Sequence, residues 1–152
     1  MKALCAAQRY KMASAQSWGW QRRPSGVTAS ILALTIRNGQ ALQGAGVNND
    51  GVLSLTDTVV TSNTATANGG NGIYNSATGA LTLASSAVVS NTGSGNGGGI
   101  RTFGVMTITD STIRNNASTI GGGGVSQDNG TLVVLTSTIA NNRGSTGGGI
   151  QV

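Results

Sequence analysis

The 152-residue sequence contains no histidine and no glutamate, and it has a single cysteine and a single proline. Without histidine there is no His general base, no Ser–His or Cys–His nucleophile pair and no His metal ligand. One cysteine excludes an internal disulfide and any CxxC zinc or redox motif. Charged residues make up only 9% of the chain and aromatic residues 3%, whereas about a quarter of an average domain is charged. These absences argue against most classes of enzyme.

The net charge of +5 belongs to one end of the chain. Residues 1–23 hold five of the nine basic residues, none of the acidic ones, both tryptophans and the cysteine. From Pro24 onward, four arginines balance four aspartates: Arg37, Arg101, Arg114 and Arg143 against Asp50, Asp57, Asp110 and Asp128. This part of the chain is formally neutral, so the charge does not support a nucleic-acid groove, and we expect no nucleic-acid partner.

The change of composition near Pro24 divides the chain into a basic N-terminal segment, residues 1–24, and a body, residues 25–152. The segment begins like a signal peptide, but Gln8, Arg9 and Lys11 interrupt it before an apolar run forms. We interpret it as disordered, or as a short helix over residues 3–16 that caps the fold. No stretch approaches the ~18 apolar residues of a membrane span, so we expect none in this chain.

The body is built from a repeat, which has to be settled before other fold reasoning. A block of the form Gly-x-Gly-[Ile/Val] occurs five times and ends at Val47, Ile73, Ile100, Val125 and Ile150. The units are therefore 25 to 27 residues long. The remaining features of each unit keep a fixed spacing, and the length varies only in the Gly-rich return and in the turn that follows the block.

Each unit has the same internal plan. An apolar-x-apolar segment follows the block, at 53–55, 81–83, 106–108 and 132–134. Five residues later comes another aliphatic residue, and three residues after that an asparagine: Val60 and Asn63, Val88 and Asn91, Ile113 and Asn116, Ile139 and Asn142. Ile31, Ile36 and Asn38-Gly39 are interpreted as the tail of a preceding unit that lacks its first strand.

Alternation of apolar and polar residues over three to five positions predicts half-buried strands, three in each unit. Strands this short have no partner inside a unit and pair with their copy in the next unit, ~4.8 Å away. The apolar positions then form internal stripes, namely Val47/Ile73/Ile100/Val125/Ile150, Leu55/Leu83/Ile108/Val134 and Val60/Val88/Ile113/Ile139. We expect glycines with positive φ at the tight corners and asparagines that form a ladder from coil to coil.

The sequence therefore predicts an all-β fold, a right-handed parallel β-helix solenoid of four to five coils with about 25–27 residues per coil. A leucine-rich or other helix-containing solenoid is the rival. No unit contains ten residues at helical spacing, and Gly, Thr, Ser and Asn fill the gaps between apolar positions. The rival fold is therefore disfavoured.

The repeat resembles that of right-handed parallel β-helix proteins of bacterial surfaces. The resemblance rests on the block at 97–100 followed by Met-Thr-Ile-Thr-Asp-Ser-Thr-Ile-Arg-Asn-Asn-Ala at 106–117, and on Leu-Thr-Ile-Arg-Asn-Gly at 34–39. The Gly-Gly-x-Ile and Ile-x-x-Asn pair also resembles the repeat of polymorphic outer membrane proteins, which usually have Phe where this chain has Val or Ile. The resemblance covers residues 27–152. It implies an exported passenger, adhesin or surface stalk without shared catalytic residues.

This resemblance further implies an extracellular or bacterial cell-surface location, although no signal peptide is visible in the chain. The partners it implies are glycans or host and cell-surface proteins. Because the sequence stops at Gln151-Val152, two residues into a new coil, we expect a fragment whose ends stack on flanking coils of a longer protein.

The main alternative is a fragment of a polysaccharide lyase or hydrolase with a similar, pectate-lyase-like β-helix. Such enzymes need clustered carboxylates, as calcium ligands or as acid/base pairs. Asp57 and Asp110 share one predicted column two coils apart, roughly 10 Å, and Asp50 and Asp128 share another three coils apart, roughly 14 Å. We interpret them as solvated turn residues, so catalytic coils of such an enzyme would lie outside this chain.

The other candidate sites have simpler interpretations. Arg101, Arg114 and Arg143 do not share one column and are interpreted as solvent-exposed. The Gly-rich blocks lack the Lys-Ser/Thr of a phosphate loop and recur in every coil. Ice binding by a threonine array is disfavoured because no full Thr-x-Thr ladder is present at the outward positions Ser54, Thr82, Thr107 and Val133, and Val59, Ala87, Thr112 and Thr138.

We therefore predict a non-catalytic structural or adhesive segment of a bacterial secreted or cell-surface β-helix protein. It would act through repeated shallow contacts of Thr, Ser and Asn side chains on its lateral faces. No catalytic, cofactor-binding or metal-binding residue is assigned, and no cofactor is expected.

Overall fold

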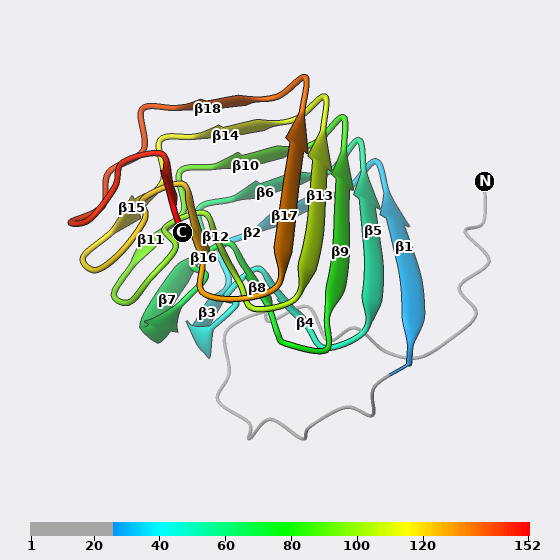
Figure 1. The fold of residues 1–152 in the computed structure, drawn as a ribbon, viewed down its shortest axis with the longest axis horizontal. Coiled ribbons are helices and arrows are strands. Elements are labelled where there is room, and N and C mark those ends of the chain that lie inside the picture. Colours follow the sequence, from blue (N-terminus) through cyan, green and yellow to red (C-terminus); the bar gives the residue numbers. More distant parts are fainter. Residues whose placement is uncertain (1–25) are drawn as a thin grey trace.

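The computed structural model describes residues 26–152 as a parallel β-solenoid, in which the coils stack and four parallel sheets form the sides (Figure 1). The predicted N-terminal segment, residues 1–24, lies outside the described residues. Sheet A contains β1 (Thr28–Leu32), β5 (Val52–Thr56), β9 (Ala80–Ala84), β13 (Val105–Thr109) and β17 (Thr131–Leu135). Sheet B contains β2 (Thr35–Arg37), β6 (Val59–Thr61), β10 (Ala87–Val89), β14 (Thr112–Arg114) and β18 (Thr138–Ala140).

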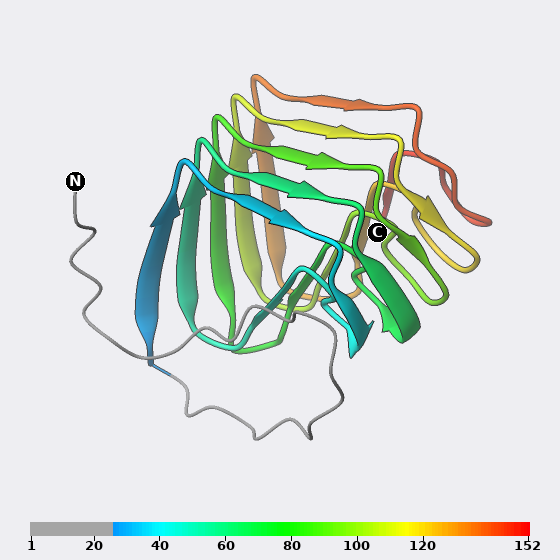
Figure 2. The ribbon, with the colours of Figure 1, turned by 180° about the vertical axis from the view of Figure 1, so that it is seen from behind.

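The other two sheets close each coil. Sheet C contains β3 (Gln40–Gln43), β7 (Thr64–Gly69), β11 (Thr92–Gly93) and β15 (Ala117–Ser118). Sheet D contains β4 (Val47–Asn49), β8 (Ile73–Asn75), β12 (Ile100–Thr102), β16 (Val125–Gln127) and β19 (Ile150–Gln151). Viewed from both sides, the strands of sheets A and B lie in step, and the loops from sheet C to sheet D protrude (Figures 1 and 2).

Every strand pairs with its copy in the next coil, as strands too short to pair within a unit must. Successive strands of sheet A start 24, 28, 25 and 26 residues apart, and each pairing is parallel. Five such turns confirm the predicted all-β parallel solenoid. Within residues 26–152, no helix is long and apolar enough to cross a membrane.

The three predicted apolar stripes are confirmed by the strand registers. Ile73 pairs with Ile100, Leu83 with Ile108, and Val88 with Ile113. The side chains of these six residues are fully buried. A fourth column, Leu53/Leu81/Met106/Leu132, completes the interior on the sheet A side. Aliphatic side chains fill the narrow coil, which explains the scarcity of aromatic residues in the repeat.

Two predictions about the coil were wrong. Each coil has four strands rather than three, because short Thr-, Ala- and Gly-containing segments also pair as sheet C. These segments lack large alternating apolar residues, so the apolar pattern did not mark them. In the first coil, β1 pairs with β5 residue by residue, with Ala29 opposite Leu53 and Ile31 opposite Leu55. The leading unit therefore contains the strand that it was expected to lack.

The predicted asparagine ladder is present, with its first three members buried and the last one half-buried. It consists of Asn63, Asn91, Asn116 and Asn142. Asn91 Nδ2 donates to Asn116 Oδ1 (3.0 Å) and to the carbonyl of Val60 (3.0 Å). Its Oδ1 accepts the backbone N–H (3.0 Å) and Nδ2 (2.9 Å) of Asn63. Each amide thus satisfies buried backbone groups at the corner between sheets B and C and joins consecutive coils.

A second polar column lines the corner between sheets A and B: Thr58, Ser86, Ser111 and Ser137. The Ser86 hydroxyl accepts the backbone N–H of Thr58 (3.1 Å) and donates to the carbonyl of Ala84 (2.8 Å). The same pattern continues from Ser86 to Ser111 and from Ser111 to Ser137. Hydroxyls therefore pair the backbone where the chain turns and the regular ladder is interrupted.

The glycines of the Gly-x-Gly blocks provide close approach rather than positive φ at their second glycine. A Cβ on Gly99 would lie 2.7 Å from the carbonyl oxygen of Gly124 and 3.0 Å from Asn116 Nδ2. Gly46, Gly72 and Gly124 make the same approach to the asparagine ladder. Only a residue without Cβ lets the returning loop pass this close to the amides.

Glycines with positive φ, such as Gly44, Gly70 and Gly97, lie at the tight corners of the Gly-rich returns, as predicted, whereas the corners after sheets A and B use non-glycine residues in the left-handed region. φ lies between 44° and 51° after sheet A, at Ala33, Asp57, Ser85, Asp110 and Thr136. It lies between 55° and 59° after sheet B, at Asn38, Ser62, Ser90, Asn115 and Asn141. The left-handed region costs an L-residue about 1–2 kcal/mol. These residues donate backbone hydrogen bonds to carbonyl groups of the next coil, for example from Ser90 N–H to Arg114 O (3.2 Å), and these bonds offset the cost.

We predict that Ile113→Asp unfolds the solenoid, because Ile113 is fully buried in the central stripe. An unpaired buried carboxylate destabilises by more than about 3 kcal/mol, a large share of the ~5–15 kcal/mol of a typical domain. Urea unfolding followed by circular dichroism measures the loss. Thr112→Asp, on the outward side of the same strand, is the control and should unfold near the wild-type midpoint. Equal stability of the two variants would contradict the observed register.

Candidate functional site

The four aspartates lie at two corners, in the columns that the sequence predicted. Asp57 and Asp110 follow strands of sheet A, with Ser85 between them. The hydroxyl of Thr136 donates to Asp110. Asp50 and Asp128 lie at the corner between sheets D and A, three coils apart. Within residues 26–152, no three His, Cys, Asp or Glu side chains come together as a metal site.

Arg101 is held in a cluster on the outer side of sheet D. Its Nε donates to Asp128 Oδ2 at 2.5 Å, and one terminal nitrogen donates to the carbonyl of Asn68 at 2.5 Å. The guanidinium lies over the ring of Phe103, 4.7 Å from its centroid. The ring of Phe103 in turn lies 5.8 Å from that of Tyr74. Asp128, Phe103 and the Asn68 carbonyl already engage Arg101, so the cluster joins neighbouring coils rather than presenting a free cation.

Tyr74 titrates abnormally in this cluster. Burial raises the pKa of the Tyr74 phenol above its ordinary value of about 10, and the nearby Arg101 charge opposes that rise. Asp50 and Asp128 raise the pKa further, because a second negative charge near them is unfavourable. The neutral phenol is therefore the form that fits the folded coil.

The three other arginines surround a different corner, between sheets B and C. Arg37 and Arg114 share one column at the end of sheet B, separated by Thr61 and Val89. Arg143 bridges to Ala117 on sheet C, only three residues after Arg114. Arg114 and Arg143 therefore lie on consecutive coils, on either side of the corner. These three guanidinium groups are exposed and have no hydrogen-bond or ion-pair partner among the described residues.

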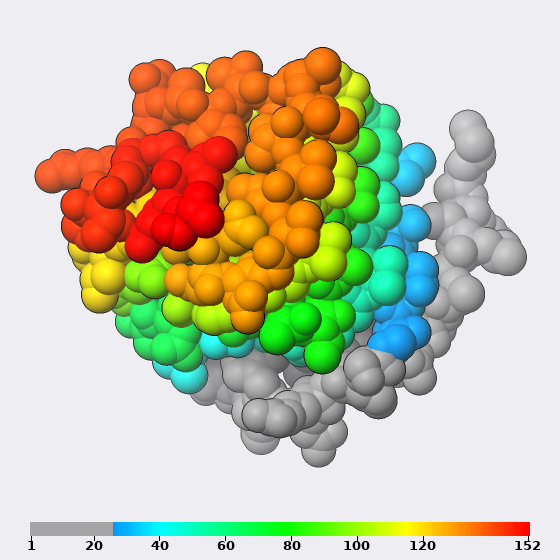
Figure 3. Space-filling view, in the orientation of Figure 1, coloured from blue at the N-terminus to red at the C-terminus, as the bar shows by residue number. Residues whose placement is uncertain are grey.

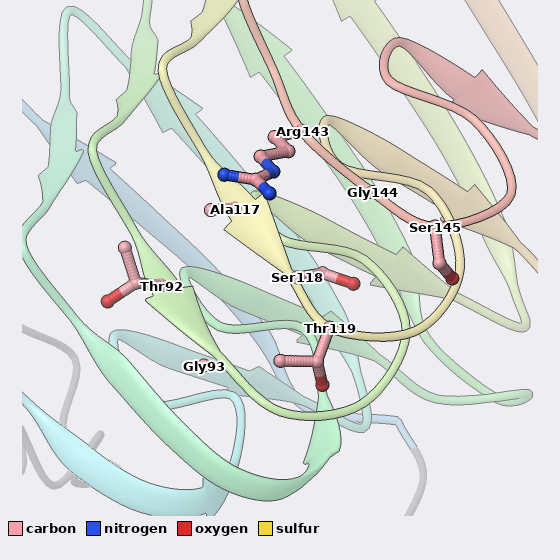
Figure 4. A pocket seen from close by; sticks show the side chains of 8 residues that line it. All are labelled: Thr92, Gly93, Ala117, Ser118, Thr119, Arg143, Gly144 and Ser145. Carbon is pink, nitrogen blue, oxygen red and sulfur yellow. The ribbon is translucent and has the colours of Figure 1, made fainter.

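A shallow hollow of about 690 Å³ lies on sheet C beside this corner (Figure 4). Three consecutive coils line it, through Thr92, Ala117 with Thr119, and Arg143 with Ser145. Figure 4 shows the side chain of Arg143 extending over Ala117. The hollow therefore combines one cation with hydroxyl groups and glycine backbone.

The hydroxyl groups of the hollow are not equivalent. The Ser118 hydroxyl donates to the carbonyl of Gly95 (2.7 Å), and Ser145 Oγ accepts the N–H of Gly121 (3.2 Å). These two hydroxyls hold the loops in place. The hydroxyls of Thr92 and Thr119 make no hydrogen bond within the described part of the chain, and both residues are exposed. Together with Arg143, they are the groups available to a ligand.

The acidic and the unpaired basic residues of the formally neutral body therefore lie at different corners of the coil. All four aspartates lie at the two edges of sheet A, whereas the unpaired arginines lie at the far end of sheet B and on sheet C. Asp110 and Arg114 are separated by four residues along the chain, at the two ends of the segment that contains β14. This is roughly 13 Å, which exceeds the Debye length at physiological salt. The corner between sheets B and C is accordingly a positive surface.

Comparison with known protein families, with curated protein sequences and with solved structures finds no match to this chain.

The sequence indicated part of this arrangement. Arg114 and Arg143 lie in different columns, as predicted. Their proximity was missed, because it depends on the corner between sheets B and C and on the fourth strand that follows it. Arg114 lies one residue after Ile113, and Arg143 lies one residue after Asn142. A prediction that included sheet C would have placed both arginines beside the asparagine ladder.

We predict that Tyr74 makes the fold less stable at alkaline pH. Its pKa is raised on folding, so its contribution is complete below pH ~10 and is lost as pH rises through the folded value. Urea unfolding at pH 8 and 11 measures the difference. Tyr74→Phe should lose less stability between these pH values than the wild type, whereas Arg101→Met should lose more. An unchanged difference in Tyr74→Phe would contradict this assignment.

Proposed function

We propose that the chain is a non-catalytic structural and adhesive segment of a secreted or cell-surface solenoid protein, and that it binds anionic glycans at the corner between sheets B and C. The single observation that supports this proposal is the pair of unpaired guanidiniums of Arg114 and Arg143 beside a hydroxyl-lined hollow. A guanidinium binds carboxylate or sulfate through paired, charge-assisted hydrogen bonds. The free hydroxyls of Thr92 and Thr119 are suited to sugar hydroxyl groups.

A polymeric ligand fits this surface better than a small anion. Arg114 and Arg143 lie on consecutive coils on either side of the corner, so each can bind a different anionic group of one chain. The hollow is shallow and crosses three coils, so a chain lying along the solenoid axis contacts each coil in turn. A polymer that carries repeated anionic groups satisfies both arginines, and each contact adds to affinity without a deep pocket.

A glycan is favoured over a nucleic acid by the chemistry of the surface. Single-stranded nucleic-acid sites combine dense basic grooves with aromatic residues on which bases stack. Among the described residues, the aromatic side chains of Tyr74 and Phe103 lie on sheet D, and their rings pack against each other and Arg101. The hollow instead offers hydroxyls and glycine backbone around a single guanidinium.

The proposed role as a scaffold is supported by the regularity of the coil. Each coil adds ~4.8 Å of length and repeats the same four faces. A rod of this kind displays its binding surfaces at fixed intervals, as a surface stalk or adhesin requires. The alternative function, a fragment of a polysaccharide-active enzyme, requires an acid and a base near the bound sugar. The aspartates lie instead at the edges of sheet A.

Binding of the purified chain to a panel of sulfated, uronic-acid and neutral polysaccharides tests the proposal. We expect salt-sensitive binding to the anionic members, weakened about tenfold by Arg143→Gln, because a charged hydrogen bond contributes about 1.5–3 kcal/mol. Arg37→Gln is the matched control: it removes the same charge roughly 14 Å from Arg114 and three coils away, so it should bind like the wild type.

Three outcomes contradict the proposal. Equal weakening by Arg37→Gln would indicate attraction to net charge rather than a site. Preferential binding of single-stranded DNA or RNA would assign the surface to nucleic acid. Release of reducing or unsaturated ends from any polysaccharide in the panel would support the enzyme alternative.

A further inference from the structure

Asn-Gly pairs recur along the chain and lie in very different surroundings. In such a pair the asparagine side chain can react with the next backbone nitrogen, because glycine has no Cβ to shield that nitrogen. The five pairs begin at Asn38, Asn68, Asn71, Asn96 and Asn129. The glycine is buried in the first four pairs and exposed in the last, at Gly130. The structure therefore distinguishes pairs that look alike in the sequence.

Two of the four protected pairs are held by hydrogen bonds of the glycine itself. The N–H of Gly39 donates to Asn63 Oδ1 (2.9 Å) in the asparagine ladder. The N–H of Gly72 donates to the carbonyl of Gly99 (3.0 Å), and Asn71 before it is fully buried. Neither glycine nitrogen is free to approach an asparagine side chain while the coil is folded.

The other two protected pairs have their side-chain amides directed elsewhere. Asn68 Nδ2 donates to Gln43 Oε1 (3.2 Å), and Asn96 Nδ2 donates to Asp128 Oδ1 (3.4 Å). The glycines that follow both asparagines are buried among neighbouring loops. These pairs, too, would react only after local opening of the coil.

Asn129 and Gly130 lie in the turn between β16 and β17, and both are exposed. This orange segment lies at the surface of the molecule in Figure 3. The N–H of Gly130 donates to Oδ1 of Asn129 itself (2.7 Å) and to no backbone carbonyl within residues 26–152. The glycine nitrogen is therefore beside the side-chain amide, whose Cγ carries that oxygen.

The fold itself requires glycine after Asn129. The φ of Gly130 is 79°, and a Cβ there would collide with the carbonyl of Gly104. The turn is held on either side, because Asp128 N–H donates to Thr102 O (2.9 Å) and Thr131 N–H donates to Gly104 O (3.3 Å). The backbone nitrogen between these anchors stays unshielded and close to the asparagine.

We propose that Asn129 is a site of spontaneous deamidation. The nitrogen of Gly130 gives up its proton to base in the solvent and attacks Cγ of Asn129. The new C–N bond closes a five-membered succinimide ring, and the side-chain nitrogen takes up a proton and leaves as ammonia. Water then adds to one of the two ring carbonyl carbons and opens the ring. The products carry aspartate, or isoaspartate with a backbone one methylene longer, at this position.

The modification changes one corner of the coil. It adds a negative charge between sheets D and A, beside Asp128, which forms the ion pair with Arg101. The isoaspartate product also lengthens the turn that leads into β17. Arg143 at the glycan corner lies on a different part of the coil, so this inference is independent of the proposed function.

One tryptic digest separates the reactive pair from the protected ones. Cleavage after arginine places Asn129 in residues 115–143 and the other four pairs in residues 38–101. The purified chain is incubated at mildly alkaline pH, and mass spectrometry follows the deamidated form of both peptides. We expect residues 115–143 to deamidate at least about tenfold faster, because the protected pairs need local opening of the coil. In urea this advantage should disappear.

Two variants assign the reaction to one side chain. Asn129→Gln should abolish the fast reaction in residues 115–143, because glutamine has to close a less favourable six-membered ring. Asn68→Gln makes the same change at another exposed asparagine and is the matched control. It should leave the rate in residues 115–143 unchanged. Circular dichroism before and after incubation shows that each chain remains folded.

Three outcomes would overturn the proposal. The first is the absence of deamidation in residues 115–143 of the folded chain. The second is an equal rate in both peptides, because the folded turn would then confer no reactivity. The third is a fast reaction that Asn129→Gln leaves unchanged, because another asparagine of that peptide would then be responsible.

Discussion

In four of the five coils, an asparagine at the corner between sheets B and C joins the backbone and side chains of its neighbours. Asn91 engages Asn63 on one side and Asn116 on the other, and it also accepts or donates to backbone groups of those coils. The returning loop passes so close to these amides that Gly72 and Gly99 have no room for a Cβ. The Gly-x-Gly block and the asparagine are therefore two halves of one packing arrangement, which keeps every coil in register with the next.

That register determines what the surface can do. Because each strand pairs residue by residue, outward side chains form columns. Charged residues that lie far apart in the sequence are thereby brought to particular corners of the coil. Aspartates reach the edges of sheet A, whereas Arg37, Arg114 and Arg143 gather around the corner between sheets B and C. A chain whose body is formally neutral thereby acquires one positive corner and one uncharged face. The proposed glycan-binding corner follows from this separation.

The sequence predicted the interior much better than the surface. Val88, Ile113 and the other stripe residues repeat with a fixed spacing, and burial of aliphatic side chains dictates that spacing. The asparagine ladder was predicted because each asparagine follows the buried aliphatic residue by three positions in every one of the four units. Sheet C was missed because residues such as Thr92, Gly93 and Ala117 carry no apolar alternation, so only pairing between coils defines it. The left-handed corners at Ser85 and Ser90 were missed because hydrogen bonds to the next coil impose them on residues without such a preference.

The unfolding free energy of Asn91→Ala tests most directly whether the ladder holds the coils together. The substitution leaves the buried carbonyl of Val60 and N–H of Asn63 without partners, so we predict a loss of about 3–5 kcal/mol, with one cooperative transition. Asn129→Ala, the same change at an exposed turn, should cost less than about 1 kcal/mol. An equally small loss for Asn91→Ala would contradict the account, because stacking would then depend on the aliphatic stripes alone.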